Sequence, residues 1–205
     1  MLRQAIERPC ITAPRALDLL SDLGVFDDSP IRYAARYLSK ATSGAAWPLP
    51  ARSRGPNNAK ASIRQVVCLL LSLCASRNTT DVAYVYEKVS RLKPDGEGWA
   101  SGLTLIDLVS GILAAALDPL HEEHALLADQ AGDGLLLRVT QGGGDAEILT
   151  PSESVMDFCA PGGKPVAAPA AIRVSGVVPF ATLLVIIGRI REMRGDTPEL
   201  MREAA

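Results

Sequence analysis

Apolar residues recur at helical spacing in the first forty residues of the chain. A first group, spaced three apart, predicts a short helix that begins after Thr12 and ends at Gly24. A second group, at i, i+3, i+4 and i+7, predicts a helix over residues 30–42 that begins at Ser29 and Pro30. The members of the second group are Ile31, Ala34, Ala35 and Leu38. Two helices joined by a short glycine-containing turn are typical of a helix-turn-helix.

The following segments alternate between a loop and strongly apolar helices. Glycines and prolines in residues 43–58 predict a loop. Residues 59–76 are apolar on almost every side after the first turn, which predicts a helix buried at the centre of the domain. A further amphipathic helix is expected over residues 81–92.

The second half of the chain has a mixed pattern. A helix is predicted over residues 102–117 and strands over 135–140 and 146–150, joined as a β-hairpin by a glycine-rich turn. An irregular segment over 151–169, a strand over 171–177 and a C-terminal helix over 179–194 complete the pattern. The predicted fold class is therefore α+β, with a helical N-terminal half and a small α/β half.

Charge divides the chain at the same place as this change of pattern. The whole chain has a net charge of −2, but no acidic residue lies between Asp28 and Asp81, where eight basic residues lie. The proline and glycines of residues 93–98 are typical of a linker. The sequence thus predicts a basic helical domain over residues 1–93 and an acidic α+β domain over residues 94–205.

The acid-free interval supplies the candidate binding residues. Three of them recur every four residues on the helix over 30–42, three lie in the loop, and two lie at the start of the helix over 59–76. They are Arg32, Arg36 and Lys40, then Arg52, Arg54 and Asn57, then Lys60 and Arg64. This concentration of cations favours a surface that faces a polyanion. Alternatively, the basic half and the acidic half attract each other within one fold.

Other classes of function have little support in the sequence. The four cysteines have no metal-ligand or disulfide spacing, and the uncharged run between Arg173 and Arg189 is too short to span a bilayer. Only two histidines are present, His121 and His124, and their spacing of three differs from that of a zinc-protease helix. We therefore expect a cytoplasmic protein that is not an enzyme and needs no cofactor or metal.

Three segments together resemble uncharacterised bacterial and prophage proteins that have an N-terminal helix-turn-helix-like region. These segments are residues 34–38 (AARYL), the basic loop residues 52–56 (RSRGP) with the apolar helix 66–75, and residues 172–176 (IRVSG) before a leucine-rich helix. The resemblance implies a DNA-binding regulator of phage type and assigns no activity or reading residue.

Two hypotheses of function follow from the sequence. The first is a transcriptional regulator that binds double-stranded DNA through its basic half, while its acidic half forms a homodimer or contacts another regulatory protein. The second is a protein-interaction or assembly module whose basic face binds an acidic protein surface.

Overall fold

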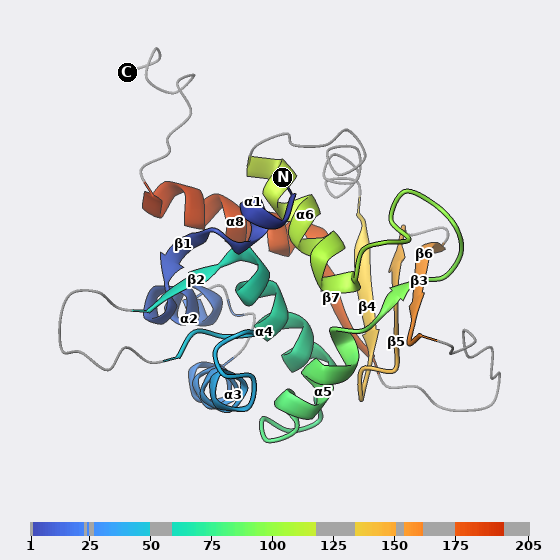
Figure 1. The fold of residues 1–205 in the computed structure, drawn as a ribbon. Helices are drawn as coiled ribbons and strands as arrows, with labels where there is room; N and C mark the ends of the chain where they lie inside the picture. The colour runs from blue at the N-terminus through green and yellow to red at the C-terminus, as the bar shows by residue number, and fades with distance from the viewer. Residues whose placement is uncertain are drawn as a thin grey trace, which may run out of the picture.

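The computed structural model describes residues 2–22, 24, 27–49, 59–117, 134–150, 154–161 and 175–194 (Figure 1). They form a mixed α+β fold, as the sequence predicts, with a two-stranded and a five-stranded sheet. The elements before residue 93 are α1 (Leu2–Glu7), β1 (Pro9–Thr12), α2 (Ala13–Asp22), α3 (Asp28–Ala41), β2 (Lys60–Ser62), α4 (Ile63–Ala75) and α5 (Val82–Val89). Those that follow are β3 (Lys93–Pro94), α6 (Leu105–Leu117), β4 (Leu136–Thr140), β5 (Asp145–Leu149), β6 (Ser154–Cys159), β7 (Ser175–Pro179) and α8 (Phe180–Arg194).

Helix α4 is the central element. Ten of its 13 residues are buried, so this helix is enclosed on every side by other elements. It packs against α1, α3, α5 and α6 and against strands β4 and β7. The prediction of a central, all-apolar helix is confirmed.

The expected first turn of this helix is instead strand β2. The prediction of one helix over residues 59–76 is wrong there, because β2 pairs with β1 in an antiparallel ladder. Ser62 then caps α4 by accepting a hydrogen bond from the backbone N–H of Gln65, whose side chain accepts one from the Ser62 N–H. Lys60 therefore lies on a strand and not in a helical turn.

The five-stranded sheet has the order β3-β6-β5-β4-β7, and all of its pairs are antiparallel. The predicted hairpin is confirmed as β4–β5. Gly142 and Gly143 have positive φ values of 88° and 68° in its turn. That backbone conformation strongly favours glycine, which explains the glycine run.

Two strands of this sheet lie where the sequence predicts none. Strand β6 falls in the segment expected to be irregular, and it pairs with β5 on one side and β3 on the other. Strand β3 falls in the expected linker. Both strands form by pairing with segments that are distant in the sequence. The local proline and glycine composition therefore wrongly predicts a linker and an irregular segment.

The described helices lie on one side of the five-stranded sheet (Figure 1). Strand β7 passes close to the C-terminal end of α4. A Cβ atom added to Gly176 would lie 2.5 Å from the Cys74 carbonyl oxygen. Glycine at this position therefore lets the strand approach the helix backbone.

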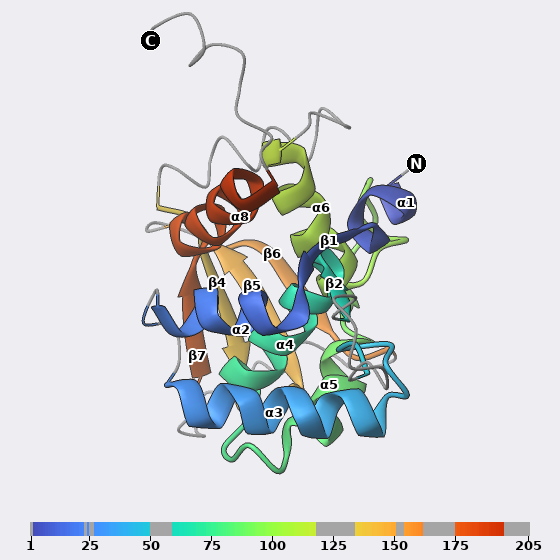
Figure 2. The same ribbon diagram turned by 90° about the vertical axis from the view of Figure 1, so that its left-hand side faces the viewer.

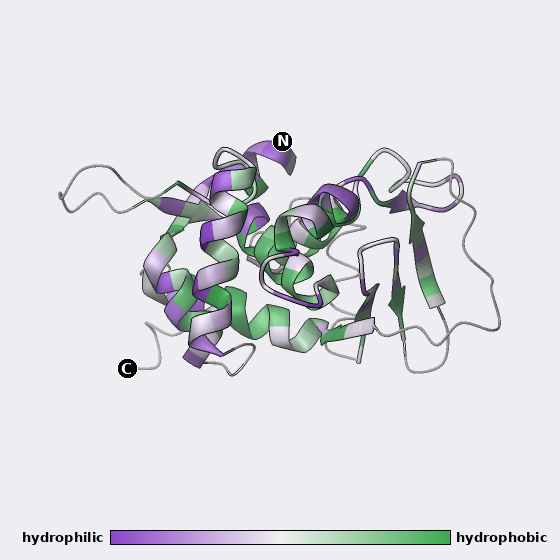
Figure 3. Cartoon of the chain, turned by 90° about the horizontal axis from the view of Figure 1, so that it is seen from below, coloured by the Kyte–Doolittle hydropathy of each residue, from purple (hydrophilic) through white to green (hydrophobic). Residues whose placement is uncertain are grey.

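Elements from both sides of residue 93 share one buried apolar cluster. The N-terminal helix α1 packs on α6, and the C-terminal helix α8 packs on α2 and β1 (Figure 2). Figure 3 shows hydrophobic residues concentrated where these elements meet and hydrophilic residues on their outer sides. This interleaving favours one cooperative unit over the separate domains expected for residues 1–93 and 94–205.

Candidate nucleic-acid interface

Helix α3 has two stripes of side chains on opposite sides. Its inner stripe, at i, i+3, i+4 and i+7, is buried, as predicted: Ile31, Ala34, Ala35 and Leu38. A second stripe with the same spacing begins two residues later and is exposed. We call it the outer stripe, and it consists of Tyr33, Arg36, Tyr37 and Lys40. The shared spacing places each stripe along one line of the helix, one toward the core and the other toward solvent.

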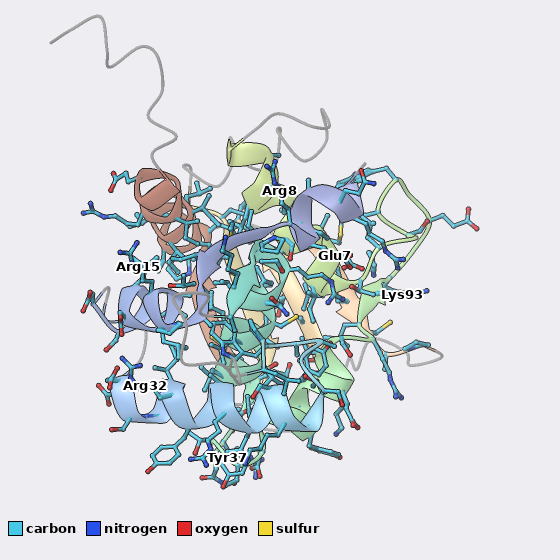
Figure 4. The ribbon with its side chains drawn as sticks, turned by 60° about the vertical axis from the view of Figure 1, so that its left-hand side comes forward. Glu7, Arg8, Arg15, Arg32, Tyr37 and Lys93 are labelled. Atoms are coloured by element: carbon cyan, nitrogen blue, oxygen red, sulfur yellow. The ribbon has the colours of Figure 1, made fainter. Side chains whose placement is uncertain are left out.

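The outer stripe combines aromatic and cationic groups. Tyr33 and Tyr37 are 58% and 47% exposed, so both rings are accessible to a partner. Tyr37 points away from the body of the molecule in Figure 4. No carboxylate of the described residues forms a salt bridge with Arg36 or Lys40. Both cations can therefore contact an anion without first breaking an ion pair within this part of the chain.

Arg32 lies on the same helix but has internal partners. Its guanidinium donates from Nε to the Asp28 carboxylate at 2.8 Å and from an Nη atom to the Asp18 carboxylate at 2.5 Å. Both hydrogen bonds raise the pKa of Arg32, and the one to Asp28 has the larger effect. Two carboxylates neutralise this cation, and the contact with Asp18 ties α3 to α2.

Arg64 is further removed from a binding role. Its Nε donates to the Asp107 carboxylate at 3.0 Å, and the side chains of this pair are only 22% and 15% exposed. Thr104 donates to the other carboxylate oxygen at 2.8 Å. The pair joins α4 to α6, so Arg64 connects the basic and acidic halves within the protein.

The remaining candidate residues are distributed as follows. Lys60 is exposed on β2, a separate element from α3. Arg52, Arg54 and Asn57 lie outside the described residues. The structure thus places Arg36 and Lys40 together on one exposed stripe, and it gives Arg32 and Arg64 partners within the protein.

Helices α2 and α3 are the two helices of the expected helix-turn-helix. Both helices are seen nearly end-on in Figure 1 and run across the view in Figure 2, so they lie side by side. The two helices are in contact, but the structure does not confirm the helix-turn-helix expectation.

Tyr33 and Tyr37 were not among the residues that sequence reasoning selects for this surface. The signal that identifies them is their spacing. They fall two residues after members of the apolar stripe, on the side of the helix opposite to the core. Tyrosine at such positions is not needed for packing, and this makes it a candidate for recognition.

The thiol of Cys68 is buried. Burial raises the pKa of Cys68 to about 12 despite the nearby Arg64 guanidinium, so this thiol stays protonated at neutral pH. The described residues contain no cluster of potential metal ligands. His121 and His124 lie outside them. No helix within the described ranges has the length and apolar character that crossing a membrane requires.

Comparison with known proteins gives no relative for this chain. No family, curated protein or solved structure matches it.

Proposed function

We propose that this protein binds double-stranded DNA through the outer stripe of α3 and acts as a non-enzymatic regulator of transcription, of the kind that prophages carry. The observation that carries the proposal is the pair Arg36 and Lys40, exposed and without a carboxylate partner among the described residues, on a helix at the edge of the fold. The acid-free sequence around this helix adds cations at Arg52 and Arg54.

The geometry favours contacts with the phosphate backbone. Cations one helical turn apart lie about 6 Å from each other along α3, comparable with the spacing of successive phosphates on one DNA strand. Tyr33 and Tyr37 can donate hydrogen bonds from their hydroxyl groups to phosphate or sugar oxygens. Insertion of α3 into a major groove, with Arg36 at a base edge, is the sequence-specific form of this proposal.

The test is binding of a random-sequence duplex at low salt, measured by fluorescence anisotropy with the full chain. We expect Arg36→Ala to weaken binding about fivefold to tenfold, since one charge-assisted phosphate contact is lost. Arg32→Ala is the matched control, because it removes the same charge from the same helix at a position that Asp18 and Asp28 already neutralise.

Two results contradict the proposal. Absence of duplex binding by the wild-type protein excludes it outright. Equal losses from Arg36→Ala and Arg32→Ala show that only net charge matters and that the outer stripe is not the contact surface.

The exposed tyrosines favour a second candidate function, which is binding of an acidic protein surface. Tyrosine and arginine are enriched at the centres of protein–protein interfaces, and the outer stripe contains both. Binding to such a partner should weaken when a tyrosine ring of the outer stripe is removed. A second copy of this chain offers such a surface through its acidic half, so self-association can be measured by sedimentation. If Tyr37→Ala disrupts self-association and no duplex is bound, this second function replaces the first.

A further inference from the structure

A groove of about 560 Å³ lies between α5, the β4–β5 turn and the end of β6. This volume is within the range of small-molecule sites in proteins. Helix α5 and the turn that follows it provide one wall, with Tyr84, Glu87, Lys88 and Arg91. Gly143 and Gly144 of the β4–β5 turn, and then Ala160 and Pro161, complete the lining. The groove is separate from the outer stripe of α3, with which it shares no residue.

The glycine turn is held firmly against α5. The Gly142 N–H donates to the Ala75 carbonyl oxygen at 2.8 Å, which anchors the turn to the end of α4. A Cβ atom at Gly143 would lie 2.8 Å from Val89 Cγ2. Backbone therefore packs directly on the helix here, and the groove has a preformed wall instead of one that must be ordered on binding.

The charged groups of the groove are two cations and one carboxylate. Lys88 Nζ lies over one face of the Tyr84 ring, 4.5 Å from its centre, in a cation–π contact. Arg91 follows three residues later and is exposed. Neither cation forms a salt bridge with a carboxylate of the described residues, Glu87 included. The lining thus has an excess of positive charge next to an exposed ring.

We propose that this groove binds a nucleotide. Arg91 and Lys88 would hold the phosphate, because a guanidinium donates two parallel hydrogen bonds to phosphate oxygens and an ammonium adds a second charge. Tyr84, which is 60% exposed, would support the planar base on the ring face opposite to Lys88, since every base has a face that stacks on an aromatic ring. Glu87 would accept hydrogen bonds from ribose hydroxyl groups.

Two sources supply this chemistry, a free mononucleotide and a nucleotide of a single-stranded nucleic acid. We use adenosine monophosphate for the first and a short single-stranded oligonucleotide for the second. Isothermal titration calorimetry on the full chain measures both. Binding of either probe that depends on the groove residues supports the site, and the probe that binds identifies the source.

Three variants test the site, and two have matched controls. We expect Arg91→Ala to weaken binding about tenfold, whereas Lys93→Ala, an exposed cation on β3 outside the groove, leaves it unchanged. Tyr84→Ala removes the ring, and its control is Tyr84→Phe, which keeps the ring and should leave binding nearly unchanged. Gly144→Leu adds bulk to the lining without altering charge, and a Cβ atom there meets nothing within 4 Å, so the backbone has room for a side chain.

Failure of this proposal is distinct from failure of the DNA proposal. Loss of nucleotide binding in the groove variants, with duplex binding by α3 intact, supports the groove alone. Absence of heat for both probes with the wild-type protein overturns it, as does binding that Gly144→Leu and Arg91→Ala leave unchanged. Equal weakening by Arg91→Ala and Lys93→Ala also overturns it, because general charge then explains the binding.

Discussion

Helices α3 and α4 are nearly equal in length, with 14 and 13 residues, but they differ in what surrounds them. Helix α3 buries one stripe and exposes the stripe opposite to it, whereas α4 is enclosed by helices and strands from both halves of the chain. The difference decides what a basic residue does. Arg36 on α3 faces solvent, and Arg64 on α4 is enclosed with Asp107. A positive charge in the sequence therefore indicates a binding surface only when its helix has a side free for a partner.

The largest effect is expected when the elements that pack on α4 are removed. We predict that a fragment of residues 1–93 does not fold cooperatively, because α4 then loses α6, β4 and β7, and α2 loses α8. Circular dichroism during thermal unfolding measures this directly. A sharp transition of the isolated fragment would contradict this prediction and show that residues 1–93 are a domain of their own, as the sequence predicts.

Substitution of Gly176 is expected to have the next largest effect, a loss of stability. A methyl group there lies 2.5 Å from the Cys74 carbonyl oxygen, so Gly176→Ala forces β7 away from α4 and lowers the free energy of unfolding by about 3 kcal/mol. Gly188→Ala in α8 is the control. Its added Cβ meets nothing within 4 Å, and alanine favours the helix by about 0.5–1 kcal/mol. Urea unfolding of both variants measures this difference in stability. Equal unfolding midpoints for the two variants would contradict the prediction.

The two arginine pairs provide a smaller and more specific contrast. Arg64→Ala leaves the Asp107 carboxylate largely buried without its cation and is expected to cost about 2 kcal/mol of unfolding free energy. Arg32→Ala removes pairs whose side chains are about half exposed, where such contacts are worth about 0.2–1 kcal/mol. Denaturant titration of both variants measures the difference. A greater loss from Arg32→Ala would mean that Arg64 is not the enclosed group described here.

Much of the fold could be predicted from local patterns. The helical spacing of residues 30–42, the apolar run that forms α4 and the glycine turn of the hairpin all contain their own signals. Strands β2, β3 and β6 could not be found in this way, because each is formed by pairing with a distant segment. Local composition even pointed elsewhere, toward a helix, a linker and an irregular segment.

The candidate site was only partly predictable, for a related reason. The spacing of Arg32, Arg36 and Lys40 correctly places three cations on one helix. Whether Arg32 is available depends on Asp18, from α2, which the spacing within α3 cannot reveal. The same applies to Arg64 and Asp107, 43 residues apart in the sequence. Pairing of charges is a property of the tertiary structure, whereas their periodicity is a property of the sequence.

Salt dependence of duplex binding tests the central claim most directly. With three or four phosphates neutralised by Arg36, Lys40 and cations of the neighbouring segment, the plot of log affinity against log salt should have a slope of about −3. The double variant Arg36→Ala/Lys40→Ala should make this slope less steep by about 2, and Arg32→Ala should leave it unchanged. A slope near zero for the wild-type protein, or the same slope for all three proteins, would contradict the claim that the outer stripe of α3 binds DNA.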